Sequence, residues 1–140
     1  MKNLVITALV TAASVAAQGT DPAGEVNLNH VIHNLELGMN TEEFLAVLGD
    51  DFTRVISMMV DAEVWRYDFP TEPGYTFTVP SGEDEVDTGG LGSGSMRMQV
   101  FVVWNESGLL GDYTVYTGNA NGVITEYRVF PDGSVRKSRL

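Results

Sequence analysis

The sequence predicts an α+β fold in which two short N-terminal helices pack on one face of an antiparallel meander sheet, giving a two-layer sandwich. Three observations lead to this prediction. Apolar residues recur at helical spacing between residues 28 and 48. After residue 51 they alternate with polar residues, as in half-buried strands. Turn-forming residues separate these segments, and 140 residues are enough for one domain with one hydrophobic core.

The first twenty residues, "MKNLVITALVTAASVAAQGT", have the layout of a secretory signal peptide. A lone Lys2 precedes an apolar run, and small residues at Val15 and Ala17 suit a cleavage site. An uncleaved anchor is the alternative, although the run is short of the about 20 residues that a membrane span needs. We therefore expect a signal peptide over 1–17, a flexible leader over 18–27, and a single periplasmic or secreted domain over 28–140.

The first predicted helix covers residues 28–37. Its apolar positions are spaced to fall on one face, and they are Leu28, Val31, Ile32, Leu35 and Leu37. Gly38 follows, and we expect it to end the helix in a left-handed conformation.

The second predicted helix starts after Asn40, whose side chain can cap it. Glu43 lies three residues on and can accept from the Asn40 amide, which completes a capping box. The predicted buried face of this helix consists of Phe44, Leu45, Val47 and Leu48, and Gly49 closes the helix.

The remaining chain predicts four to six strands. The segments are "RVISMMV" (54–60), "EVWRYDF" (63–69), "MRMQVFVVW" (96–104), "DYTVYTG" (112–118) and "GVITEYRVF" (122–130). Alternation places Trp65, Tyr67 and Phe69 on one side of the sheet, and the residues from Met96 to Trp104 at every second position on one face. The stretch "PSGEDEVDTGGLGSGS" (80–95) predicts a mobile acidic loop.

Composition narrows the classes of function. The formal net charge of -11 repels nucleic acid and anionic lipid headgroups. The absence of cysteine excludes disulfides, thiolate metal sites and lipid anchoring at a cysteine. No nucleophile with a partnered base is apparent, so we expect no enzyme activity and no cofactor.

Two patterns in the sequence offer possible metal ligands. His30, His33 and Glu36 follow one another at three-residue spacing on the first helix, where the alternative is a solvated polar stripe. The acidic run 83–87 offers oxygen ligands for calcium, and the alternative is a solvated loop. Neither pattern is specific enough to predict a metal site.

The stretch "LELGMNTEEFLAVLGDDF" followed by "VWRYDF" resembles the SmpA/OmlA family of outer-membrane assembly proteins. The residues that carry the resemblance are Leu35, Gly38, Met39, Thr41, Glu43, Leu48, Gly49, Trp65 and Tyr67. The resemblance implies a non-catalytic envelope protein that binds another protein, such as an outer-membrane β-barrel or its assembly machinery. The β-lactamase inhibitor proteins are built from a similar unit, which leaves a periplasmic or secreted enzyme inhibitor as the alternative.

We place the expected contact surface at the turn between the helices and at the acidic loop, with the two tryptophans either in the core or as an exposed platform. The candidate contact residues are Met39, Asn40, Thr41, Glu42, Trp65, Trp104, Glu83, Asp84 and Glu85. Gly38, Glu43, Leu48, Gly49 and Tyr67 are expected to hold the fold.

Overall fold

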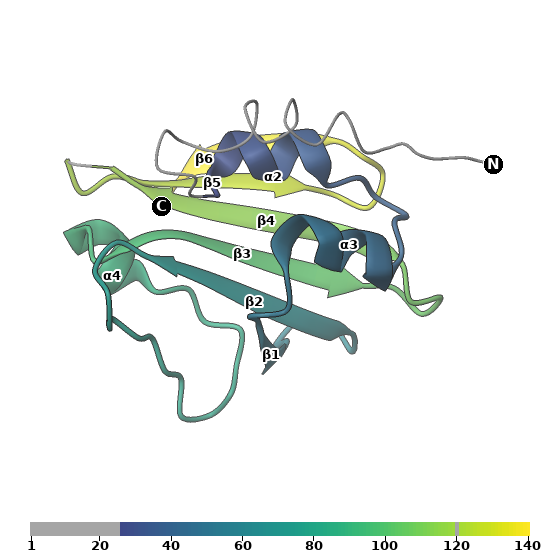
Figure 1. The fold of residues 1–140 in the computed structure, drawn as a ribbon, viewed down its shortest axis with the longest axis horizontal. Helices are drawn as coiled ribbons and strands as arrows, with labels where there is room; N and C mark the ends of the chain where they lie inside the picture. The colour runs from purple at the N-terminus through teal and green to yellow at the C-terminus, as the bar shows by residue number, and fades with distance from the viewer. Residues whose placement is uncertain (1–25, 120) are drawn as a thin grey trace. The chain divides into compact units, whose positions relative to one another are not determined.

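The computed structural model describes residues 26–119 and 121–140, and the chain divides into two units, 1–35 and 36–140 (Figure 1). The predicted signal peptide and almost all of the predicted leader therefore lie outside the described residues. The described part of the first unit holds helix α2 (Leu28–Asn34). The second unit holds α3 (Thr41–Leu48), β1 (Thr53–Ile56), β2 (Glu63–Pro70), α4 (Thr88–Ser93), β3 (Met96–Trp104), β4 (Leu110–Gly118), β5 (Ile124–Val129) and β6 (Val135–Arg139).

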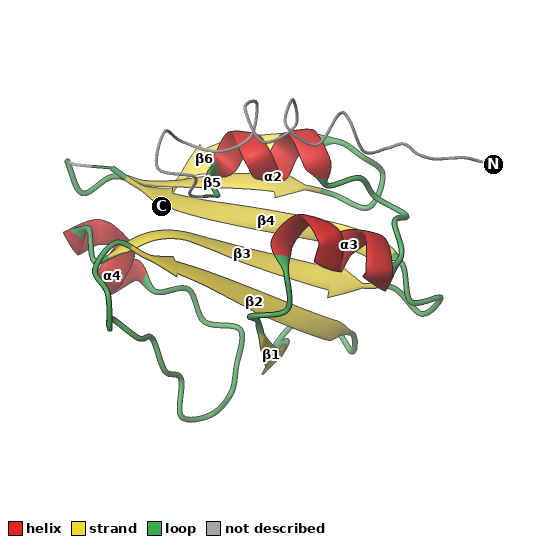
Figure 2. Cartoon of the chain, in the orientation of Figure 1, coloured by secondary structure: helices red, strands yellow, loops and turns green. Residues whose placement is uncertain are grey.

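The strands form one six-stranded sheet in chain order, with every neighbouring pair antiparallel (Figure 2). Trp65 lies opposite Val102, and Val102 lies opposite Tyr113. Since side chains alternate along each strand, these residues share one side of the sheet, which we call the aromatic face. Val64 and Phe101 belong to the opposite side, which we call the groove face.

The helical half of the predicted fold class is wrong. The part of the chain that the structure describes is mainly the six-stranded meander with three short helices, and it does not bear out a layer of two N-terminal helices. α2 ends at Asn34 instead of Leu37 and belongs to the first unit, whereas α3 belongs with the sheet. The spacing of apolar residues predicts that a segment is helical, but it does not specify the surface against which the helix packs.

The predicted capping box of α3 is confirmed. The Asn40 side chain accepts from the Glu43 amide at 2.8 Å, and the Glu43 carboxylate accepts from the Asn40 amide at 2.9 Å. Gly49 caps the other end with a φ of 80°. Its carbonyl accepts a hydrogen bond from the Tyr67 hydroxyl at 2.7 Å, so the end of α3 is attached to β2.

Gly38 has the expected left-handed backbone, with a φ of 89°, but it does not cap a helix. It lies in a turn closed by a hydrogen bond from the Met39 amide to the Glu36 carbonyl, and its own amide donates to Leu110. The prediction of a cap failed because α2 ends four residues earlier, at Asn34.

An aromatic cluster links α3 to the aromatic face. The Phe44 ring centroid lies 5.1 Å from that of Trp104 and 6.0 Å from that of Trp65. Phe52 stacks on Trp65 at 3.7 Å between centroids. Phe44 is fully buried, and burying a side chain of this size contributes about 1.5–3 kcal/mol. This cluster is what holds α3 on the sheet.

Residues 75–94 cover part of the groove face, which corrects the expectation of a mobile loop over 80–95. Within this segment α4 places Leu91 against Met96 and Ile124. Val86 packs against the buried group of Val55, Val64 and Phe101. Alternation along the strand predicts that Met96 lies on the aromatic face with Met98. Met96 instead packs against Leu91 of α4, because an irregularity at Phe69/Pro70 shifts the register between β2 and β3.

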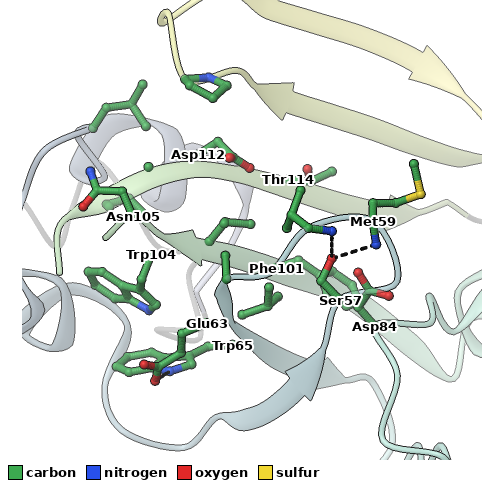
Figure 3. A pocket seen from close by; sticks show the side chains of 18 of the residues that line it. Ser57, Met59, Glu63, Trp65, Asp84, Phe101, Trp104, Asn105, Asp112 and Thr114 are labelled. Atoms are coloured by element: carbon green, nitrogen blue, oxygen red, sulfur yellow. Dashed lines mark hydrogen bonds between the residues drawn. The ribbon is translucent and has the colours of Figure 1, made fainter. Parts of the chain in front are cut away.

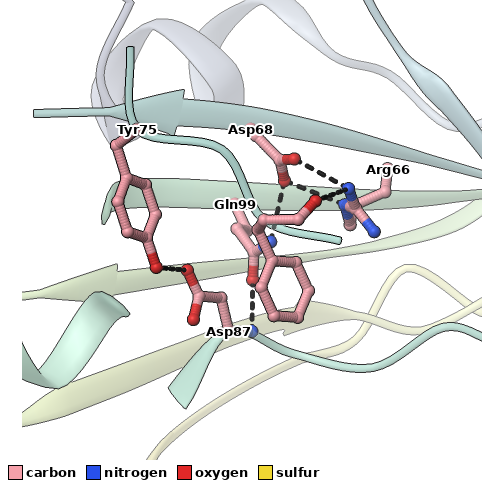
Figure 4. Close-up of polar contacts among 6 residues, drawn as sticks. Arg66, Asp68, Tyr75, Asp87 and Gln99 are labelled. Atoms are coloured by element: carbon pink, nitrogen blue, oxygen red, sulfur yellow. Dashed lines mark hydrogen bonds and ion pairs between the residues drawn. The ribbon is translucent and has the colours of Figure 1, made fainter. Parts of the chain in front are cut away.

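A buried polar network fastens this segment to the sheet (Figure 4). Gln99 is fully buried; its side-chain oxygen accepts from the Asp87 amide at 2.8 Å and its side-chain nitrogen donates to Asp68 at 2.7 Å. Asp68 also pairs with Arg66 at 2.8 Å. The Tyr75 hydroxyl donates to Asp87 at 2.7 Å, and this bond raises the pKa of Tyr75. Each charged side chain of this network has a hydrogen-bond partner within it, so these groups stabilise the packing of residues 75–94 on the sheet.

Candidate protein-binding groove

Four apolar side chains stand exposed where β1 meets β2. Ile56 is 62% exposed, Met58 65%, Met59 88% and Val60 51%. Singly exposed apolar residues are common on protein surfaces, but a contiguous group marks an interaction site more often. We call these four residues the apolar turn.

The apolar turn is held in place by hydrogen bonds. The Ser57 hydroxyl accepts from the amides of Met59 at 3.2 Å and of Val60 at 3.1 Å. The Met58 amide donates to the Asp84 carboxylate at 3.4 Å. A turn fixed in this way loses little conformational entropy when a partner binds it.

An open groove of about 1210 Å³ runs alongside the apolar turn (Figure 3). Met59 and Val60 form part of its wall, and Val64, Phe101 and Val103 supply apolar lining from the groove face. The groove is therefore continuous with the part of the apolar turn formed by Met59 and Val60.

The charge of the groove lining is negative. Its ionisable residues are Asp61, Glu63, Asp84, Glu106 and Asp112, with Arg54 and Arg128 as the cations. Five carboxylates against two guanidinium groups leave a formal charge of −3. Arg54 and Glu63 pair at 3.1 Å. Burial raises the pKa of Asp112, and nearby Arg128 opposes this shift.

Two lining residues each have a buried hydrogen-bond donor without an acceptor among the described residues. Nε of Arg128 belongs to the groove face, whereas Nε1 of Trp104 lies in the aromatic cluster on the other side of the sheet. The neighbouring Trp65 differs, because its Nε1 donates to Glu63 at 2.6 Å. A buried donor without an acceptor costs about 1–3 kcal/mol, so a bound molecule that supplied an acceptor would recover this free energy.

The groove collects some of the residues predicted from the sequence as contact residues. Thr41 and Asp84 line it. Trp65 and Trp104 also border it, but they are only 4% and 5% exposed and belong to the core, which corrects the suggestion of an exposed platform.

The other candidate residues lie outside the groove lining. Met39 is half-buried and its carbonyl accepts from the Leu110 amide, while Asn40 is engaged in the capping box. Glu42 and Glu85 are exposed, and the backbone of Glu83 forms an isolated parallel β-bridge with Ile56.

Sequence reasoning missed the apolar turn because it assigned "RVISMMV" to a strand. β1 ends at Ile56, and the following residues leave the sheet. The signal was present in the lack of alternation after Ile56, where Met58, Met59 and Val60 are consecutive apolar residues.

Among the described residues, no three His, Cys, Asp or Glu side chains gather closely enough to hold a metal ion. Neither His30, His33 and Glu36 nor the acidic run 83–87 forms such a group. None of the helices in the described ranges is long and apolar enough to cross a membrane.

Comparison with known proteins gives no match: no protein-family model, curated protein or solved structure is similar enough to this chain to assign a family. The SmpA/OmlA resemblance stays a prediction that rests on the residues that carry it.

Proposed function

We propose that this protein is a non-catalytic, exported cell-envelope protein that acts by binding another protein through the apolar turn and the adjoining groove. The observation that carries the proposal is the apolar turn, whose four side chains are each at least half exposed. Leaving such a group in water is unfavourable, and contact with a partner would remove the cost. The resemblance supplies the setting, which is assembly or maintenance of the outer membrane.

The structural role of the buried charged residues supports a protein-binding function over a catalytic one. The buried polar network around Gln99 and Asp87 fastens residues 75–94 to the sheet. The groove lining combines carboxylates with apolar side chains, a composition suited to contact with a protein.

A secreted or periplasmic enzyme inhibitor is the second candidate. The observation that favours it is the fixed geometry of the apolar turn, where Ser57 accepts two amide hydrogen bonds. An exposed turn that is ordered before binding suits insertion into the cleft of an enzyme.

In-cell crosslinking of the tagged protein in its native host, followed by fractionation and mass spectrometry, separates the two candidates. Recovery with outer-membrane β-barrel proteins supports the assembly role. Recovery of a single soluble enzyme, whose activity falls when the pure protein is added, supports the inhibitor. Recovery of no specific protein, in the presence of a positive control for crosslinking, would contradict both.

A further inference from the structure

We propose that the groove binds an extended polypeptide segment in which apolar side chains are flanked by lysine or arginine. This inference rests on the proposed protein-binding function and names the chemistry of the partner. Three properties of the groove point to this segment: its charge, its apolar lining and the unpaired hydrogen-bond donor of Arg128.

The charge of the lining selects a cationic partner. With Arg54 paired to Glu63, the remaining ionisable groups are four carboxylates against Arg128. Asp61 and Glu106 are exposed, so they stand where the flanking side chains of a bound segment would lie. The net charge of the whole chain, -11, would also speed the approach of a cationic segment.

The apolar part of the surface selects apolar side chains between those cations. Met59 and Val60 on the wall face a lining that includes Val64, Phe101 and Val103. Methionine side chains are flexible and polarizable, so Met58 and Met59 can adapt to partner side chains of different shapes. The groove is therefore an apolar channel between carboxylates.

An unpaired donor of the groove face favours a main chain. Nε of Arg128, which lies opposite Thr114 on this face, is buried in the lining without an acceptor in the described part of the chain. An extended segment carries backbone carbonyl groups that are not used in its own secondary structure, and these are suitable acceptors. An anionic ligand could also accept this bond, but the carboxylates of the lining oppose it.

Strand addition at the end of β1 is already blocked by the chain itself. The Ile56 amide donates to the Gly82 carbonyl at 2.8 Å, and the Asp84 amide donates to the Ile56 carbonyl at 2.9 Å. The partner is therefore recognised in the groove by side chains and by the unpaired donor of Arg128, not by extending the sheet beside Ile56.

The test measures binding of two labelled ten-residue peptides to the full chain by fluorescence anisotropy. One peptide alternates leucine with lysine, and the other replaces every lysine with glutamate. We expect the lysine peptide to bind at least about tenfold more tightly, with the difference shrinking as salt is raised. Equal binding of both peptides, or binding of neither at millimolar concentration, would overturn the inference.

Matched variants place the site. Asp61→Asn combined with Asp112→Asn should weaken binding of the lysine peptide by about three- to tenfold, because two carboxylates leave the lining. Glu42→Gln combined with Glu85→Gln changes the net charge equally but outside the lining, and should change affinity less than about twofold. Equal losses in the two double variants would show attraction by net charge alone and overturn the assigned site. Thermal melting of each variant confirms that it is folded.

Two further outcomes separate this inference from the proposed function. Capture of a partner through Met59 without a preference for the lysine peptide would leave the proposed function standing and overturn the inference. The second outcome is that the full chain binds anionic lipid vesicles more tightly than the lysine peptide, and that Met59→Gln abolishes the vesicle binding. This result would assign the surface to a membrane and would also overturn the inference.

Discussion

Trp65 contacts three other rings of the aromatic cluster. It stacks on Phe52 and contacts Phe44 and Trp104. Trp65→Ala should lower the free energy of unfolding by about 3–5 kcal/mol, since it removes a large buried side chain and leaves a cavity. Urea denaturation measures this. Met59→Ala is the control, because Met59 is 88% exposed and its truncation should cost less than about 0.5 kcal/mol. Equal losses in the two variants would contradict the assignment of Trp65 to the core.

Gly118 and Gly89 test the fit of α4 against the sheet. A Cβ at Gly118 would collide with the Leu91 carbonyl, whereas a Cβ at Gly89 would meet only ordinary contacts. Neither residue needs a left-handed backbone. Gly118→Ala should therefore destabilise by about 1–3 kcal/mol through overpacking. Gly89→Ala, inside α4, should be neutral or stabilising by up to about 1 kcal/mol. Thermal melting of the two variants in parallel checks the opposite signs, and a stable Gly118→Ala would show that α4 does not pack closely there.

At the scale of single elements, the capping box of α3 gives the clearest prediction. Asn40→Ala removes the acceptor for the Glu43 amide and should cost about 0.5–2 kcal/mol. Asn40→Ser is the matched control, because serine caps helices about as well as asparagine does. Chemical denaturation compares them. If serine were no better than alanine, the side-chain cap would not be what stabilises this end of α3.

The elements also show what could be predicted from the sequence. Asn40, Glu43 and Gly49 act within a few residues of one another, so the start and end of α3 follow from local chemistry. α4 could not be predicted in this way, because "TGGLGS" has poor helix formers. Its stability comes from contacts distant in sequence, such as Leu91 against Ile124.

The candidate groove was less predictable than the strands that form it. Alternation along β2 and β3 correctly places Trp65 and Tyr67 on one side. The exposure of Met59 depends on where β1 ends, and a one-dimensional pattern does not specify that point. The groove also needs Asp84 and Asp112, which are distant in sequence and meet only through the packing of residues 75–94 and the register of the sheet.

At the scale of the whole molecule, stability should depend on pH through two carboxyl groups, Glu126 and Asp112, whose pKa values are shifted in opposite directions. Burial alone would raise the pKa of Glu126, but hydrogen bonds from Arg136, Tyr116 and Ser138 outweigh it and lower the pKa below the ordinary 4.5. The ionised form is thus favoured in the folded state. Its stabilising contribution is present above about pH 4.5 and is lost as the pH falls through the lowered value.

Asp112 acts in the opposite direction. Burial raises its pKa, so the ionised form is disfavoured in the folded state and its cost is present at neutral pH. Glu126→Gln should lower stability at pH 7 and flatten its loss in acid, whereas Asp112→Asn should keep or raise stability at pH 7. Denaturation curves from pH 3 to 7 measure both. A Glu126→Gln variant as acid-sensitive as the parent would contradict the role given to Glu126.

The chain carries a formal net charge of -11, and the apolar turn exposes four apolar side chains next to the acidic groove. The central claim is that the apolar turn contacts the partner. The most direct measurement introduces a photo-crosslinking amino acid at Met59 and, in separate variants, at the exposed Glu42 and Thr125. Each variant is irradiated in the native host and its adducts are identified by mass spectrometry. We predict one specific protein adduct from Met59 and none from Thr125. Adducts from Glu42 or Thr125 but not from Met59 would contradict the account.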